Sequence, residues 1–78
     1  MELHADPSRA VASEVRAAMA RQNYSRSDLA TALGVTAHTA GRKYSGEAEF
    51  TVTELVQVAH WLSIPVDQLF VSATAAAS

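Results

Sequence analysis

Few residues in this 78-residue chain have the types and spacing that catalysis or metal binding requires. The three histidines, His4, His38 and His60, are too dispersed for a familiar metal-ligand spacing, and without cysteine no thiolate site can form. The segment Gly41–Gly46 has the glycine spacing of a phosphate-binding loop, but Glu47 follows where that loop requires lysine. No nucleophile, base and orienting carboxylate occur in a familiar context. We therefore expect no enzymatic activity, no metal and no cofactor.

The basic residues are the remaining candidates for chemistry, and they are unevenly placed. The sequence has 6 lysines and arginines against 8 acidic residues, a formal net charge of -2. Every basic residue precedes Gly46, and only acidic charges follow it. A domain with one cationic end suits docking on phosphates by one face, although net acidity predicts modest non-specific affinity. The basic residues are Arg9, Arg16, Arg21, Arg26, Arg42 and Lys43, and the later acidic ones are Glu47, Glu49, Glu54 and Asp67.

The length and hydropathy of the chain indicate how many domains it forms and in which compartment it is expected. The chain is long enough for one small domain, which we expect over residues 1–71, with a disordered Ala/Ser-rich tail over residues 72–78. The N-terminus lacks the basic and apolar regions of a secretory signal, and no apolar run approaches the roughly 18 residues of a membrane span. We therefore expect a cytoplasmic protein with no membrane partner.

Capping residues locate the helices that must position the cations. Asp6 followed by Pro7 predicts the start of an amphipathic first helix, which ends near Asn23. Ser25 and Asp28 fit a capping box that opens a short second helix. The first half of the chain is therefore expected to be helical.

The second half shows the same signals. Gly34 allows the positive φ that ends the second helix, Thr36 caps a third helix over about residues 37–45, and Gly46 ends it. A second capping box begins with Thr51 and opens a fourth helix, which is broken near Pro65 and followed by one last helical turn. No alternating strand pattern occurs.

Apolar residues at helical spacing predict the core. Leu33 and Leu62 are the positions where truncation should be most harmful. The expected core stripes are Val11, Val15, Ala18, Met19 and Gln22 in the first helix, Leu29, Ala30 and Leu33 in the second, and Leu55, Val58, Ala59 and Leu62 in the fourth.

The segment Arg26–Ser45 resembles the helix-turn-helix of the lambda repressor and Cro family. The matching residues are Leu29, Leu33 and Val35 at the apolar contacts between the two helices, Ala30 at the close crossing and Gly34 at the turn. The stretch from Leu55 to Phe70 is similar to the family's fourth and fifth helices. The resemblance implies an all-α, compact bundle of about five short helices around a central helix-turn-helix.

The sequence departs from the family pattern within the third helix. Ala40 is smaller than the branched residue that is usual there, and Lys43 stands where an apolar residue normally packs. We expect Tyr44 to fill part of that gap while Lys43 extends outward along its methylene stem.

The resemblance also implies a function and a site. It predicts a sequence-specific regulator of transcription, a Cro-like phage or bacterial repressor in the bacterial cytosol or nucleoid, whose third helix enters the major groove of double-stranded operator DNA. The implied base contacts are Ala37, His38, Thr39 and Arg42, with Arg42 as a bidentate partner of guanine. The implied phosphate contacts are Arg26, Thr36, Lys43 and Ser45.

Two alternatives stay open at this point. The chain could instead be a protein-binding module on a helix-turn-helix scaffold, an antirepressor or accessory factor, which the net acidity favours. Repressor, activator and Cro-like switch are likewise not separated by the sequence.

Paired half-sites would require a homodimer, at least on DNA, for which the last helical turn or Trp61 offers a surface. No sensor domain follows the helices, so no small-molecule ligand is expected.

Overall fold

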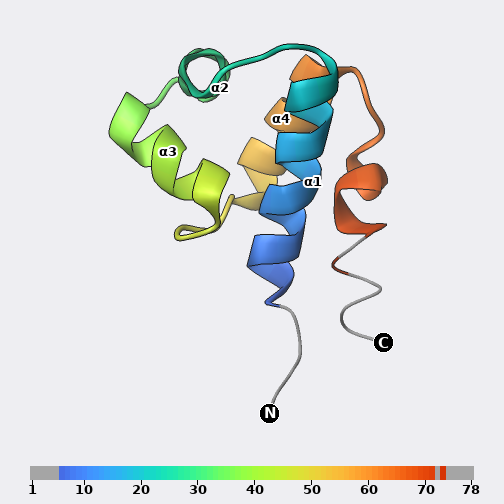
Figure 1. Ribbon diagram of the computed structural model, residues 1–78. Helices are drawn as coiled ribbons and strands as arrows, with labels where there is room; N and C mark the ends of the chain where they lie inside the picture. Colours follow the sequence, from blue (N-terminus) through green and yellow to red (C-terminus); the bar gives the residue numbers. More distant parts are fainter. Residues whose placement is uncertain (1–5, 72, 74–78) are drawn as a thin grey trace.

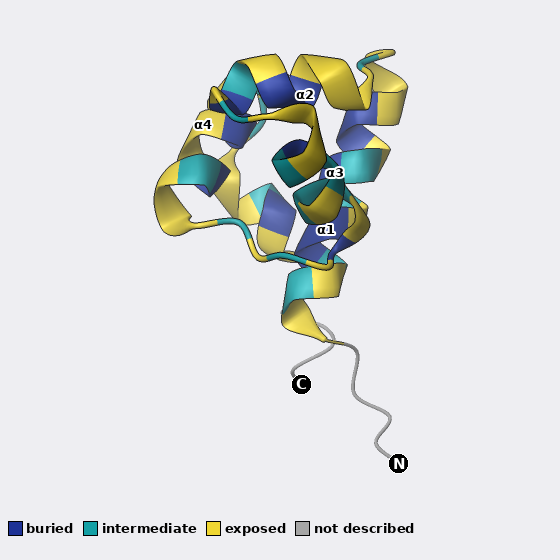
Figure 2. Ribbon diagram, turned by 90° about the vertical axis from the view of Figure 1, so that its left-hand side faces the viewer, coloured by how far each residue is buried: buried dark blue, intermediate teal, exposed yellow. Residues whose placement is uncertain are grey.

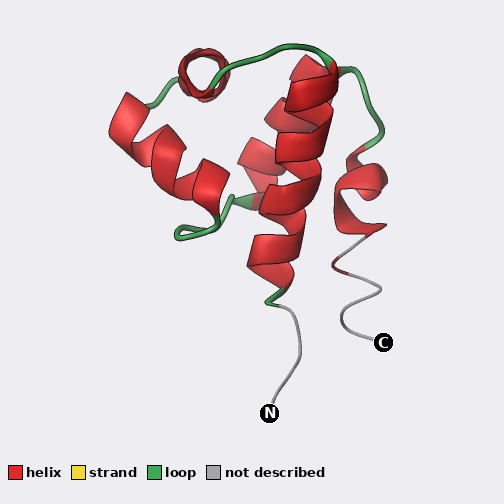
Figure 3. Ribbon diagram, viewed as in Figure 1, coloured by secondary structure: helices red, strands yellow, loops and turns green. Residues whose placement is uncertain are grey.

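The computed structural model describes residues 6–71 and 73, and every element in them is helical. Figure 3 shows helices joined by loops, without a strand in the described part of the chain. The elements are α1 (Pro7–Arg21), α2 (Arg26–Leu33), α3 (Ala37–Ser45), α4 (Val52–Leu62) and the 3-10 helix η1 (Val66–Phe70). The predicted all-α class is confirmed, with a 3-10 helix as the last of the five.

The helices begin where the capping pattern predicts. Ser25 Oγ accepts the Asp28 N–H at 3.2 Å, and the Asp28 carboxylate accepts the Ser25 N–H at 2.8 Å. Thr51 Oγ1 likewise accepts the Glu54 N–H at 3.1 Å, and the Glu54 carboxylate accepts the Thr51 N–H at 2.8 Å. Each pair satisfies backbone donors that a helix N-terminus leaves free. Both predicted capping boxes are therefore confirmed.

Left-handed backbone conformations end the helices. Gly34 and Gly46 have φ of 70° and 90°, and Asn23 has φ of 62° as expected. At Gly46 a side chain would be disfavoured twice, by the positive φ and by a Cβ position only 3.1 Å from Cγ of Arg9. The end of α3 is thus packed directly against α1.

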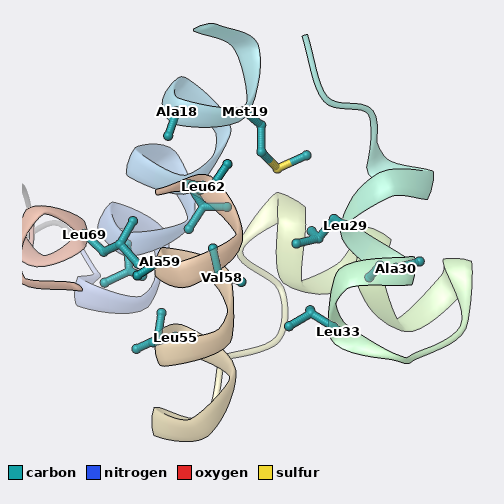
Figure 4. Close-up of a cluster of buried hydrophobic side chains, with 13 residues drawn as sticks. Ala18, Met19, Leu29, Ala30, Leu33, Leu55, Val58, Ala59, Leu62 and Leu69 are labelled. Carbon is teal, nitrogen blue, oxygen red and sulfur yellow. The ribbon is translucent and has the colours of Figure 1, made fainter. Parts of the chain in front are cut away.

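The core forms between the helices (Figure 4). Leu62 and Leu69 are almost completely buried, and Leu33 is 9% exposed. Gln22, expected on the apolar stripe, is exposed instead, and its Nε2 donates to the Leu62 carbonyl at 2.7 Å. The other buried members are Val11, Val15, Ala18, Met19, Leu29, Ala30, Ala40, Leu55, Val58 and Ala59. The predicted core stripes are otherwise confirmed.

The packing separates α3 from the chain's C-terminal part. α2 and α3 lie on one side of α1, whereas η1 packs against α1 and α4 on the other side (Figure 1). The expected tail over residues 72–78 lies outside the described residues except for Ala73, which is partly buried against the core. No helix in the described ranges has the length and hydropathy needed to cross a membrane.

Candidate nucleic-acid interface

α3 turns one face toward the protein and the opposite face outward. Ala40 is its one fully buried residue, at 0% exposure. His38, Arg42 and Ser45 follow one another at helical spacing and are all exposed, and Ala37 is exposed at the start of the helix. Figure 2 views the molecule from this side and shows how buried and exposed positions alternate along the helices. The structure thus gathers most of the residues implied for base contact on one outward surface.

The two threonines at the start of α3 are engaged with each other. Thr36 Oγ1 accepts the Thr39 N–H at 3.2 Å and donates to Thr39 Oγ1 at 3.1 Å. Thr39 is partly buried, whereas Thr36 is exposed. The Thr36 hydroxyl therefore caps the helix, and Thr39 presents less surface outward than His38.

Arg42 is the principal cation on the outward surface. Its Nε lies 3.8 Å from Oε1 of Glu47, and the two side chains are 51% and 62% exposed. The Arg42 carbonyl accepts a hydrogen bond from Ser45 Oγ at 3.1 Å. An exposed ion pair of this length contributes little free energy, so the guanidinium is available to another partner.

Arg26 belongs to a cationic cluster that the sequence did not indicate. Its guanidinium carbon lies 5.6 Å from the ring centroid of Tyr44, and that of Arg16 lies 5.8 Å from the same centroid. Arg16 Nη1 also donates to the Tyr44 carbonyl at 2.7 Å. Because these contacts join α1, α2 and α3 over long sequence separations, only an aromatic residue near the end of α3 could have hinted at them.

Lys43 does not occupy the position that the sequence predicts. Its side chain is only 11% exposed, and Nζ donates to Oε1 of Glu54 at 2.7 Å and to the carbonyl of Glu49 at 3.0 Å. The expected outward extension is wrong, because a carboxylate and a carbonyl hold the ammonium against the protein. An ammonium held by Glu54 and Glu49 in this way is poorly placed to contact a phosphate.

The same contacts change the pKa of the Glu54 carboxyl. Burial alone would raise the pKa of Glu54, because the charged form loses hydration. The hydrogen bond and charge of Lys43, together with the N–H and hydroxyl of Thr51, outweigh burial and hold this pKa below its ordinary value. Glu54 is therefore a carboxylate at neutral pH, and the pair with Lys43 is ionic.

Two further features of the described residues concern metal binding and a surface hollow. Residues 6–71 and 73 gather no three side chains that could hold a metal ion. A hollow of about 190 Å³ lies on the side of α1 and η1, with no lining residue from α3. Its lining residues are Pro7, Ser8, Val11, Glu49, Phe50, Leu55, Phe70 and Ala73.

Together, the fold and this surface define a small all-helical domain in which a short, outward-facing helix follows a second helix through a tight turn. Residues 6–78 match the family model of the BetR domain, and the chain belongs to the BetR domain family. No curated protein matches the chain.

Solved structures with the same fold come from a regulator of gene expression. Two crystal structures of the clp gene regulator ClgR from Corynebacterium glutamicum are similar to this chain, both with 20% sequence identity. One has a TM-score of 0.84 and covers 94% of this chain and 78% of its own. The other has a TM-score of 0.81 and covers 95% and 96%. At this identity the similarity shows the fold, and the finer assignment to the lambda repressor and Cro family stays a prediction.

Proposed function

We propose that this chain is a sequence-specific, double-stranded DNA-binding regulator of transcription that inserts α3 into the major groove. The observation that carries the proposal is the outward surface of α3, where His38 and Arg42 are exposed while Ala40 holds the opposite face in the core. Arginine and histidine carry the donors that base edges recognise. A helix that buries so little of itself is free to enter a groove.

Small residues favour a close approach to DNA. Gly41 lies between His38 and Arg42, and apart from its chain neighbours and the adjoining α3 backbone no atom lies within 4 Å of the position that a Cβ would take there. Ala37 is exposed one turn earlier. The backbone of α3 can therefore come near base edges, which places the short histidine ring within reach of them. Ala37 itself could contact a thymine methyl group.

Arg26 is the best candidate for a phosphate contact. It is exposed at the first position of α2, and the helix that precedes a recognition helix crosses the DNA backbone. The Asp28 carboxylate is bound to the Ser25 N–H and hydroxyl at this same helix end. Because that carboxylate repels anions, we assign the contact to the Arg26 guanidinium, not to the backbone of α2. The Thr36 and Ser45 hydroxyls are additional candidates.

The proposal extends to the protein's biological role. The regulator would act in the bacterial cytoplasm as a Cro-like repressor, and a homodimer on the DNA would bind paired half-sites about one helical turn apart. The similarity in fold to ClgR, described as a clp gene regulator, supports regulation in general.

A second function is favoured by exposed apolar residues of α4 and the C-terminal part, which together are taken as the candidate protein-binding surface. Val52 and Val56 of α4 are 79% and 55% exposed, and Phe70 and Val71 are 37% and 60% exposed. Exposed apolar side chains suit a protein partner. A protein-binding module with weak or no DNA affinity would use this surface and leave α3 free.

Enrichment of duplexes from a random DNA library separates the two functions. The proposed regulator should enrich a common motif, whereas the Arg42→Ala variant should enrich that motif less strongly and with one base position no longer defined. The Arg21→Ala variant is the matched control, because it removes the same charge from the exposed end of α1. If the unmodified chain enriches no motif at low salt, the protein-binding function becomes the better account.

A further inference from the structure

The ion pair between Lys43 and Glu54 joins two helices whose backbones are not in close contact. Throughout the described helices, no Cα atom of α3 lies within 8 Å of a Cα atom of α4. Lys43 Nζ and Glu54 Oε1 are nevertheless 2.7 Å apart, and their side chains are 11% and 15% exposed. The lysine stem therefore bridges a gap between the last turn of α3 and the first turn of α4.

Both ends of this bridge are fixed by further hydrogen bonds. On one side, Lys43 Nζ also donates to the Glu49 carbonyl in the connecting loop at 3.0 Å. On the other, Glu54 Oε1 also accepts the Thr51 N–H at 2.8 Å, as part of the capping box of α4. One carboxylate oxygen thus serves both the start of α4 and the end of α3. The bridge is anchored to backbone at each end and allows little movement.

On the side of α3 that faces α1, Tyr44 packs against the core and its carbonyl accepts the Arg16 hydrogen bond, whereas the ion pair of Lys43 is the polar contact that holds α3 toward α4. Ala40 is the only fully buried residue of α3, and an alanine methyl group contributes little apolar area. Lys43 directly follows Arg42, so a rotation that pulled Lys43 away from Glu54 would also re-aim Arg42. The direction in which Arg42 points therefore depends on whether the ion pair between Lys43 and Glu54 is intact.

We propose that Lys43 is a positioning residue: its ion pair with Glu54 sets the orientation in which α3 presents Arg42 and His38 to base edges, and Lys43 itself does not bind DNA. This inference rests on the proposed function. It differs from the sequence-based expectation, in which the Lys43 ammonium contacts a phosphate. Replacing a buried ion pair by apolar residues is often neutral for net stability, and in some proteins such a pair selects one arrangement, which fits an orienting role.

Three variants test the proposal. Lys43→Met keeps an unbranched apolar stem and removes the ammonium. Glu54→Gln keeps an oxygen that can accept the Thr51 N–H and removes the negative charge. Lys43→Arg keeps the positive charge and is the conservative control. Thermal unfolding of each variant is first followed by circular dichroism. Binding is then measured well below the lowest melting temperature.

The measured quantity is discrimination, the ratio of affinities for the enriched duplex and for a random duplex. For Lys43→Met and Glu54→Gln we expect this ratio to fall by roughly tenfold, which is the discrimination supplied by one bidentate base contact. Affinity for random duplex should change little, and Lys43→Arg should keep most of the discrimination. A purely structural role would lower the melting temperature without changing the ratio.

A phosphate contact by Lys43 predicts the opposite pattern for Glu54→Gln. Release of the ammonium would then raise affinity for every duplex, and Lys43→Met would lower affinity for every duplex with a salt slope shallower by about one. That result, or unchanged discrimination in Lys43→Met and Glu54→Gln, would overturn the positioning role alone. If Lys43→Met does not fold, Glu54→Gln decides. If the unmodified chain itself shows no discrimination, the proposed function fails and the positioning role fails with it.

Discussion

The guanidinium of Arg42 lies 3.8 Å from the carboxylate of Glu47, and each side chain is more than half exposed. Glu47 directly follows the glycine that ends α3, so its charge lies beside the surface that we propose enters the groove. A carboxylate there competes with DNA for Arg42 and also repels phosphates. Part of the net acidity of the chain therefore lies at the proposed interface itself, where it opposes DNA binding.

Glu47→Gln should strengthen DNA binding. Removal of the carboxylate frees Arg42, and since an exposed pair contributes about 0–1 kcal/mol, affinity should rise by up to about fivefold at low salt. Fluorescence anisotropy titrations at two salt concentrations measure this effect. Asp67→Asn removes the same charge from η1 and is the matched control. Equal effects of the two substitutions would place Glu47 away from the interface.

The stability contributed by Glu54 should depend on pH. Because contacts in the folded state hold the pKa of Glu54 below its ordinary value, its stabilising effect is present above the unfolded-state pKa. This effect is lost as pH falls through the lower folded-state pKa. Urea unfolding of the unmodified chain and of Glu54→Gln between neutral and acidic pH should show a gap in stability that narrows toward acid. A gap that stays constant would contradict the ionic pairing with Lys43.

Gly41 within α3 and Gly46 directly after it should respond in opposite ways to substitution by alanine. Gly46→Ala meets both a φ of 90° and a Cβ position 3.1 Å from Arg9 Cγ, so it should destabilise the fold by about 1 kcal/mol or more. Gly41→Ala has free space and a helical position, so it should stabilise the fold by roughly 0.5–1 kcal/mol. Thermal and urea unfolding measure both.

Gly41→Ala has a second consequence for DNA. The added methyl group projects from the surface proposed to face the bases, so DNA affinity should fall although the protein becomes more stable. A variant that is both more stable and equally good at binding DNA would show that the α3 backbone does not approach the bases closely.

The helices and the core could be predicted from sequence because their signals are local. A capping box such as Ser25 with Asp28 operates over three residues, and the α4 stripe repeats with the helical period. The partner of Lys43 could not be predicted, because it depends on how far α3 and α4 stand apart. The same holds for Arg16 and Tyr44, which meet only after α1 and α3 pack together. The one sign of this ion pair in the sequence is Lys43 itself, a charged residue where the lambda repressor and Cro family usually has an apolar one.

Arg42→Ala and Arg26→Ala together test most directly whether α3 binds specific bases while α2 contacts the phosphate backbone. Complete binding isotherms are needed for both variants on the enriched duplex, on its single-base variants and on random duplex, over a range of salt concentrations. Arg21→Ala is the control for loss of one positive charge. The protein is used as the full chain, and folding of each variant is checked by circular dichroism.

The account predicts that Arg42→Ala costs about 1–3 kcal/mol on the enriched duplex, relaxes discrimination at one base pair and changes binding to random duplex little. Arg26→Ala should weaken binding to all duplexes by a similar factor, with a salt slope shallower by about one. Equal losses on every duplex for Arg42→Ala, or no loss for either arginine, would contradict the account.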